Sequence, residues 1–162
     1  MQTLHNRTCV FAGAAAGDGT AAVEALLKGG MNVAVMTHQA GRANVLAERL
    51  NARGYPGKCA VYEENGKGPA EKQTETYEAV EKQFGSVDVV ISNTGSLGRA
   101  NEPETVTSEE LMENISHLIC GAFDMAMTAL PFFKRSRAPR VILMTSVEGR
   151  GGGNLESFTN SV

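Results

Sequence analysis

The sequence predicts an α/β fold, a doubly wound parallel sheet with helices on both faces. Apolar runs of strand length alternate with amphipathic segments of helix length from about residue 8 to residue 145. Repeated strand–helix–strand units are joined by right-handed crossovers, which place the strands parallel in one sheet. The chain has 162 residues, of which 42% are hydrophobic. This size and composition fit one globular domain, so residues 1–162 are expected to form a single domain.

The first elements surround a glycine-rich turn. Thr8–Ala12 is a short run of strand-forming residues, and it leads into Ala12–Gly19, which carries a Gly-x-x-x-Gly-x-Gly pattern. Thr20–Lys28 then has helical spacing and stops at a pair of glycines. Glycines allow a sharp turn and let a ligand approach main-chain N–H groups at a helix N-terminus. The pattern is therefore typical of a turn that holds a phosphate.

The middle of the chain repeats the alternation twice. Strands are expected over Asn32–Met36 and Cys59–Tyr62, and helices over Arg42–Arg53 and Ala70–Phe84. Val87–Ser92 is apolar at both odd and even positions. Such a run predicts a fourth strand that is buried on both faces, as in a parallel sheet.

The last predicted elements are one long helix and a fifth strand. The helix is expected from about Ser108 to Ala129, because Thr107 and Glu110 form a capping-box pattern and Pro131 falls near its end. Val141–Thr145 is the fifth strand, and the alternation stops after it. A sheet that ends early would leave one face of this strand bare. The two explanations are a partner that covers it and a chain that is a fragment, incomplete at its C-terminus.

Composition excludes several classes of function. A net charge of −3 argues against a nucleic-acid surface, and no run of residues resembles a signal peptide or a membrane span. The chain is therefore expected to be cytoplasmic. Cys9, Cys59 and Cys120 are far apart and not clustered with histidines. They are interpreted as buried thiols, with no disulfide and no metal site.

Four segments in order carry a resemblance to a known family: Ala12–Gly19, Ser92–Gly95, Gly121–Pro131 and Val141–Ser146. They are similar to the cofactor turn, the Asn-Asn-Ala-Gly motif, the central helix and the serine-bearing strand of the short-chain dehydrogenases/reductases. The resemblance spans essentially the whole chain. It implies a Rossmann-like sheet, NADP or NAD as cofactor, hydride transfer between alcohols and ketones, and oligomers.

The resemblance also implies a set of cofactor-binding residues, and one of them departs from the family pattern. The set is Gly13, Ala15, Gly17, Asp18, Gly19, Thr37, His38, Asn93 and Gly95. The family usually has an apolar residue where Asp18 stands. A carboxylate there would repel a pyrophosphate by about 1–4 kcal/mol, or it would cap the first helix and leave the turn without a ligand.

The end of the second strand bears on the choice of cofactor. Nicotinamide folds that prefer NAD place an acidic residue there to bind the ribose hydroxyls. This chain has Thr37 and His38 instead, which favours NADP, with His38 as a phosphate partner. The alternative for His38 is an ordinary exposed residue at a strand end.

The catalytic positions implied by the resemblance are mostly occupied by inert side chains. Ser146 matches the catalytic serine, whereas Leu118 stands at the asparagine position. Phe158 and Val162 match the Tyr-x-x-x-Lys pair. A phenyl ring has no proton to donate and valine has no ammonium group. No tyrosine occurs after Tyr77, so a shifted alignment does not restore the proton donor.

Two hypotheses follow from these departures. In the first, the chain is a degenerate member of the family, a pseudoenzyme that does not catalyse alone and forms an oligomer with an active relative or with itself. In the second, the chain is part of an active NAD(P)-dependent alcohol/ketone oxidoreductase whose proton donor lies elsewhere.

Overall fold

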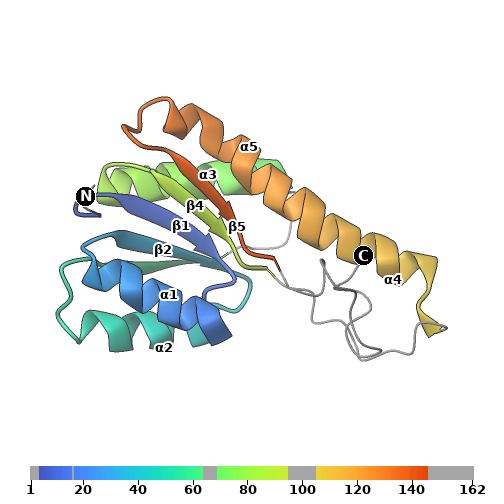
Figure 1. The fold of residues 1–162 in the computed structure, drawn as a ribbon, viewed down its shortest axis with the longest axis horizontal. Helices are drawn as coiled ribbons and strands as arrows, with labels where there is room; N and C mark the ends of the chain where they lie inside the picture. Colours follow the sequence, from blue (N-terminus) through green and yellow to red (C-terminus); the bar gives the residue numbers. More distant parts are fainter. Residues whose placement is uncertain (1–3, 16, 64–68, 95–104, 146–162) are drawn as a thin grey trace.

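The structure, a computed structural model, describes residues 4–15, 17–63, 69–94 and 105–145. Its centre is a five-stranded sheet in the order β3-β2-β1-β4-β5, and all four strand pairings are parallel (Figure 1). The strands are β1 (Thr8–Ala12), β2 (Asn32–Thr37), β3 (Cys59–Glu63), β4 (Val89–Ser92) and β5 (Arg140–Leu143). This order is that of a Rossmann-like sheet, as expected.

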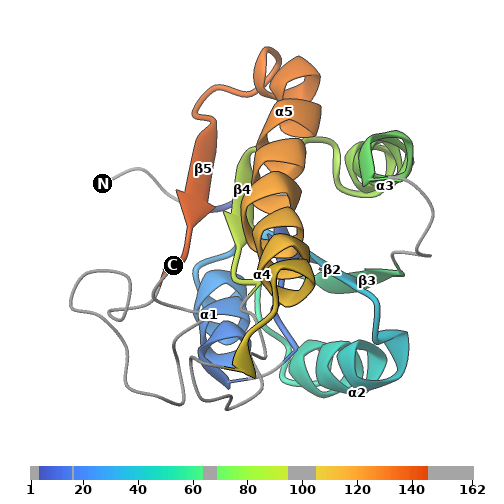
Figure 2. The same ribbon diagram turned by 90° about the vertical axis from the view of Figure 1, so that its right-hand side faces the viewer.

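Helices cover both faces of the sheet. They are α1 (Gly17–Lys28), α2 (Ala40–Asn51), α3 (Pro69–Phe84), α4 (Ser108–Ile115), the π-helical segment η2 (Ser116–Cys120) and α5 (Gly121–Phe133). Figures 1 and 2 show α1 and α2 on one face and α3 and α5 on the other. The doubly wound architecture predicted from the alternation is therefore confirmed, and the predicted element ends differ from the observed ones by at most four residues.

The two faces of the sheet bury different side chains because successive strand residues point in opposite directions. On β1, Phe11 belongs to the core beneath α1 and α2, whereas Val10 belongs to the core beneath α3 and α5. Tyr77 of α3 is fully buried in the second core, where its hydroxyl donates to the carbonyl of Met125 (3.1 Å). All four residues of β4 are buried, as predicted for a strand covered on both faces.

The long helix differs from its prediction in three respects. It runs without interruption from Ser108 to Phe133, and Pro131 lies inside its last turn. The N–H of Lys134 still donates to the Leu130 carbonyl (3.2 Å), so the turn closes around the proline. Contrary to expectation, this helix is also long and apolar enough to cross a membrane. Length and composition alone are weak evidence, because core helices meet the same criterion.

Side chains on β5 are exposed, in contrast with those on β4. Each of its four residues lies at the surface, at the outer edge of the sheet. Val141 and Leu143 pair with Val90 and Ser92, and Ile142 pairs with Ile91. Because neighbours in register point to the same face, both faces of β5 are open. The sequence predicted one bare face on this strand, and the structure exposes both.

Two of the three cysteines fit their interpretation and one does not. Cys9 and Cys59 are buried, and burial raises the pKa of the Cys59 thiol to about 11, so that it stays protonated at neutral pH. Cys120 is exposed, and no residue of its segment η2 is buried. The prediction of a third buried thiol was wrong.

A buried aspartate joins three elements at the amino-terminal edge of the sheet. The Asp88 carboxyl group accepts hydrogen bonds from the N–H of Thr8 (3.0 Å) and from the hydroxyls of Ser86 and Ser136 (both 2.6 Å). Its side chain is buried, so a polar group left unpaired there would be costly. Asp88 thereby links the start of β1, the start of β4 and the loop that leads to β5.

We predict that Asp88→Ala lowers the free energy of unfolding by about 3 kcal/mol, because it leaves buried donors without an acceptor. Glu81→Gln is the matched control, since Glu81 forms an exposed ion pair with Arg135. This control should cost less than about 1 kcal/mol. Urea unfolding followed by circular dichroism measures both. Equal costs for the two variants would show that Asp88 does not anchor the fold.

Candidate functional site

The predicted cofactor residues come together at the carboxyl edge of the sheet. The strand register places Ala12 of β1 opposite both Met36 of β2 and Ser92 of β4. The residues that follow these three positions therefore emerge side by side. In open parallel sheets, ligands bind outside this edge, where the strand order reverses. Here the reversal lies at β1, between β2 and β4.

Gly13 lies in direct contact with the end of β4. Its φ is +77°, and a Cβ added there would overlap the main-chain carbonyl of Asn93. The Asn93 side chain donates from Nδ2 to the Gly13 carbonyl (3.2 Å), and its main-chain N–H donates to the Ala12 carbonyl (3.0 Å). The glycine turn is thus fixed to β4 by both hydrogen bonds and close packing.

The other two glycines of the turn have different environments. Gly19 is buried, and a Cβ there would lie 2.5 Å from the Gly13 carbonyl oxygen, so helix α1 packs closely against the turn. Gly17, with φ at +54°, is exposed, and a Cβ there would meet no atom within 4 Å. The backbone at Gly17 is therefore open to an approaching ligand. A tight turn, an open backbone and close helix packing are the three uses of glycine in dinucleotide-binding turns.

Asp18 lies in the first turn of α1 and is exposed. Among the residues that the structure describes, none donates a hydrogen bond to its carboxylate, so the self-capped turn weighed from the sequence gains no support there. Helix N-termini carry positive partial charge, which stabilises a carboxylate in this place. Ala15, also in the predicted set, is half-buried in the turn before the helix.

Thr37 and His38 lie where β2 ends, at the same edge. The Thr37 hydroxyl accepts the N–H of Gln39 (3.0 Å), which tightens the passage into α2. His38 is exposed. The structure thus brings these two residues to the edge that carries the glycine turn, and it provides no acidic side chain at either position.

The catalytic positions are described only in part. Leu118 is half-buried within η2, where the N–H of Gly121 donates to the Ser116 carbonyl in a π-helical bond. His117, its neighbour, is exposed. The other residues predicted for the site lie outside the described residues: Gly95, Ser146, Phe158 and Val162.

Sequence reasoning missed two features of this edge. The hydroxyls of Ser92 and Thr94 lie 3.2 Å apart and share a hydrogen bond at the end of β4. A polar residue that closes an apolar run was the available signal. The π-helical segment has no comparable signal in the sequence, although such segments are frequent at functional sites. Within the described residues, no group of His, Cys, Asp or Glu could hold a metal ion.

Comparison with known proteins identifies the class to which this fold and turn belong. The sequence profile of the family described as "short chain dehydrogenase" matches residues 7–158. The chain therefore belongs to the short-chain dehydrogenase family. The 3-oxoacyl-[acyl-carrier-protein] reductase FabG of Staphylococcus epidermidis is 30% identical over 150 residues, which are 91% of this chain and 59% of that protein. The farnesol dehydrogenase of Aedes aegypti is 29% identical over 92% of this chain and 60% of its own length.

A solved structure supports the fold. The NAD+-bound xylitol dehydrogenase superposes with a TM-score of 0.86 at 17% identity, over 99% of this chain and 60% of that one. At this identity the likeness shows the fold alone. The chain spans about 60% of the length of the curated relatives it matches.

We predict that Gly13→Ala is far more damaging than Gly17→Ala, although both glycines have positive φ. The left-handed backbone costs about 1–2 kcal/mol in either variant. Only at Gly13 does the added methyl group also overlap Asn93, and this overlap raises the total loss of unfolding free energy to about 2–5 kcal/mol. Urea unfolding of the two variants measures the difference. Equal destabilisation would mean that the turn is not held against β4.

Proposed function

We propose that this polypeptide, as one incomplete domain over residues 1–162, is a non-catalytic subunit of the short-chain dehydrogenase family that binds NADP or NAD weakly. The observation that carries this proposal is the absence of a free phenol. The chain has three tyrosines, and none follows residue 77. The hydroxyls of Tyr55, Tyr62 and Tyr77 donate to Glu24, Gln83 and the Met125 carbonyl, respectively. A ketone held at the carboxyl edge would therefore receive no proton from a tyrosine of this chain.

The geometry of the glycine turn supports residual binding of a nicotinamide dinucleotide. The exposed backbone at Gly17 and the N-terminus of α1 suit a pyrophosphate. In this proposal, the remainder of the turn and the part of the site that would contact the adenosine are formed by Gly13, Ala15, Gly19, Asn93 and Gly95. Asp18 opposes the pyrophosphate, because two negative charges would share one helix end. Thr37 and His38 favour NADP over NAD, since neither is an acid.

The proposed partner is a family member, either an active relative or a second copy of this chain. The proposal involves neither nucleic acid nor a membrane. The support is a line of exposed apolar side chains on the long helix, which we call the helix stripe: Met112, Ile119, Phe123, Met127 and Leu130. Large contiguous apolar surfaces mark interaction sites in water. The oligomer is placed in the cytoplasm, where NADP and an active relative would be available.

A second candidate function is an active NAD(P)-dependent alcohol/ketone oxidoreductase of which this chain is a fragment. The observation that favours it is the coverage, since the matched relatives are named as a reductase and a dehydrogenase and are longer than this chain. In that case Ser146 is one of the catalytic residues and the proton donor lies in polypeptide beyond residue 162. The intact mass of the protein made from the native gene separates the two candidates.

We predict that Asp18→Asn tightens NADPH binding by about tenfold, because it removes one like charge worth about 1.4 kcal/mol at the helix end. Isothermal calorimetry on the wild type and the variant measures the two dissociation constants. Glu48→Gln is the matched control, since it removes an exposed carboxylate from α2. A micromolar dissociation constant for the wild type, or the same change in the control, would contradict the proposal.

A further inference from the structure

Two arginines face the same side of the sheet at its amino-terminal edge. Arg140 is the first residue of β5 and pairs in register with Val89, which pairs in turn with Cys9 of β1. Arg7 lies two residues before Cys9, and its carbonyl accepts the N–H of Asn32, which continues the pairing of β1 with β2. Residues in register share a face, and so do alternate residues along a strand. Both arginine side chains therefore lie on the face that carries α1, where Cys9 and Val89 are buried.

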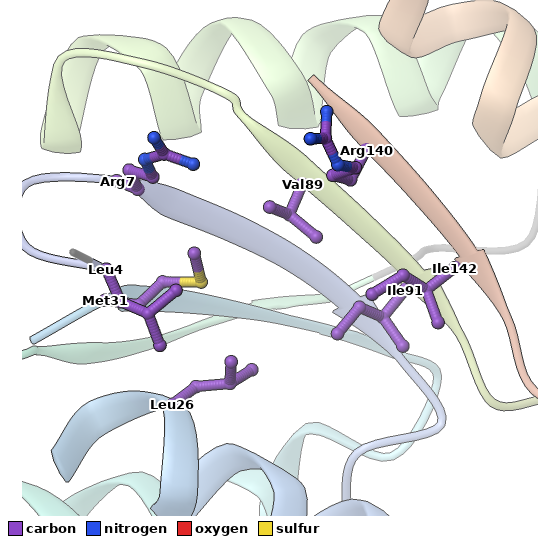
Figure 3. A pocket seen from close by; sticks show the side chains of 8 residues that line it. All are labelled: Leu4, Arg7, Leu26, Met31, Val89, Ile91, Arg140 and Ile142. Atoms are coloured by element: carbon purple, nitrogen blue, oxygen red, sulfur yellow. The ribbon is translucent and has the colours of Figure 1, made fainter. Parts of the chain in front are cut away.

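The two guanidinium groups border one small pocket. In the sheet β4 lies between β1 and β5, so the backbones that carry Arg7 and Arg140 are about 10 Å apart. Both side chains line the pocket, and Figure 3 shows them on either side of Val89. Val89 and Ile91 close its base, since each is only 6% exposed. The volume is about 250 Å³, below the range of about 300–1,000 Å³ for cofactor sites, so the arginine end suits a small ligand.

The backbone that carries these arginines is fixed by the buried Asp88. Its carboxyl group accepts the N–H of Thr8 (3.0 Å), directly after Arg7, and its main-chain carbonyl accepts the N–H of Arg140 (3.0 Å). The Ser136 hydroxyl donates to the same carboxyl group (2.6 Å) and so holds the loop before β5. Binding groups that are positioned beforehand lose less entropy when a ligand binds. The arginine pair is therefore positioned by contacts that need no ligand.

Neither arginine forms an ion pair with another residue that the structure describes. The guanidinium group of Arg140 donates to the neighbouring Pro139 carbonyl (2.7 Å), which leaves its other N–H groups for a ligand. The Asp88 carboxyl group accepts its hydrogen bonds from one main-chain N–H and two serine hydroxyls, and from neither arginine. Within the described chain, two positive charges thus share one face without a compensating anion.

We propose that Arg7 and Arg140 bind a phosphate group at the amino-terminal edge of the sheet. A guanidinium fork matches two phosphate oxygens at once, and a phosphate group carries a charge of about −1.5 to −2 at pH 7, so it balances both cations. A carboxylate carries one charge and would leave the second arginine uncompensated. The ligand is inorganic phosphate or a small phosphate ester, whose carbon chain would lie along Leu4 and the exposed Ile142.

This site is separate from the one proposed for NADP or NAD. The glycine turn follows the carboxyl end of β1, whereas Arg7 precedes its amino end. A strand of five residues is about 17 Å long. The inference therefore goes beyond the proposed function and does not depend on it.

Isothermal calorimetry with inorganic phosphate and with butyl phosphate, at constant ionic strength, tests this inference. The wild type should bind phosphate saturably. Tighter binding of butyl phosphate would identify an ester as the favoured ligand, and equal or weaker binding would identify inorganic phosphate. Arg7→Gln and Arg140→Gln should each weaken binding by about tenfold or more, because each removes charge-assisted hydrogen bonds. Arg140→Lys keeps the charge but loses the fork, so it should retain part of the affinity.

Arg49→Gln is the matched control, because it removes an exposed arginine of α2 and should bind phosphate like the wild type. Circular dichroism checks that each variant is folded. No saturable binding by the wild type, an equal loss in the control, or an unchanged affinity in either arginine variant would overturn the inference. Titration with NADPH tests the cofactor proposal separately, since Arg140→Gln should leave NADPH binding as it is in the wild type. A wild type that binds phosphate through these arginines but never NADPH would contradict that proposal and support this site.

Discussion

The contact between the Gly13 backbone and the end of β4 is the constraint on which the candidate site depends. Overlap with the Asn93 carbonyl excludes a side chain at Gly13, and the Asn93 amide donates to the Gly13 carbonyl. This fixes where the chain leaves β1 and therefore where α1 begins. The exposed backbone at Gly17 and the helix N-terminus then face the carboxyl edge together. The packing of β1 against β4 thus holds the turn in the position that our proposal of phosphate binding requires.

The chemistry at this edge is less complete than its geometry. The turn keeps the glycines that a dinucleotide requires, yet it adds the carboxylate of Asp18 at the end of the helix. The hydroxyls of all three tyrosines donate hydrogen bonds to acceptors within the same chain. The same molecule exposes apolar side chains on β5 and on the long helix. The retained glycine turn, the absence of a tyrosine after residue 77 in the given sequence and the exposed apolar side chains support our proposal of a subunit that acts in an assembly.

Local patterns predicted most of the fold because strand and helix periodicities are short-range properties. Burial of β4 and exposure of β5 followed from the run Val87–Ser92 and from the end of the alternation. Three features depend on tertiary contacts and were missed. Helix α1 begins at Gly17 and not at Thr20, because Gly19 packs against the turn. The π-helical segment has no recognisable signal in the sequence, and Cys120 is exposed as part of that segment, in which no residue is buried.

The proposal of a non-catalytic subunit can be tested by steady-state oxidation of NADPH by the isolated 162-residue polypeptide, supplied with a panel of ketones and aldehydes. We expect no turnover above the uncatalysed rate at any NADPH concentration, because the hydroxyls of the three tyrosines donate to Glu24, Gln83 and the Met125 carbonyl and none is placed to protonate a reduced carbonyl. Sustained, saturable turnover of a carbonyl compound by the purified polypeptide would contradict it.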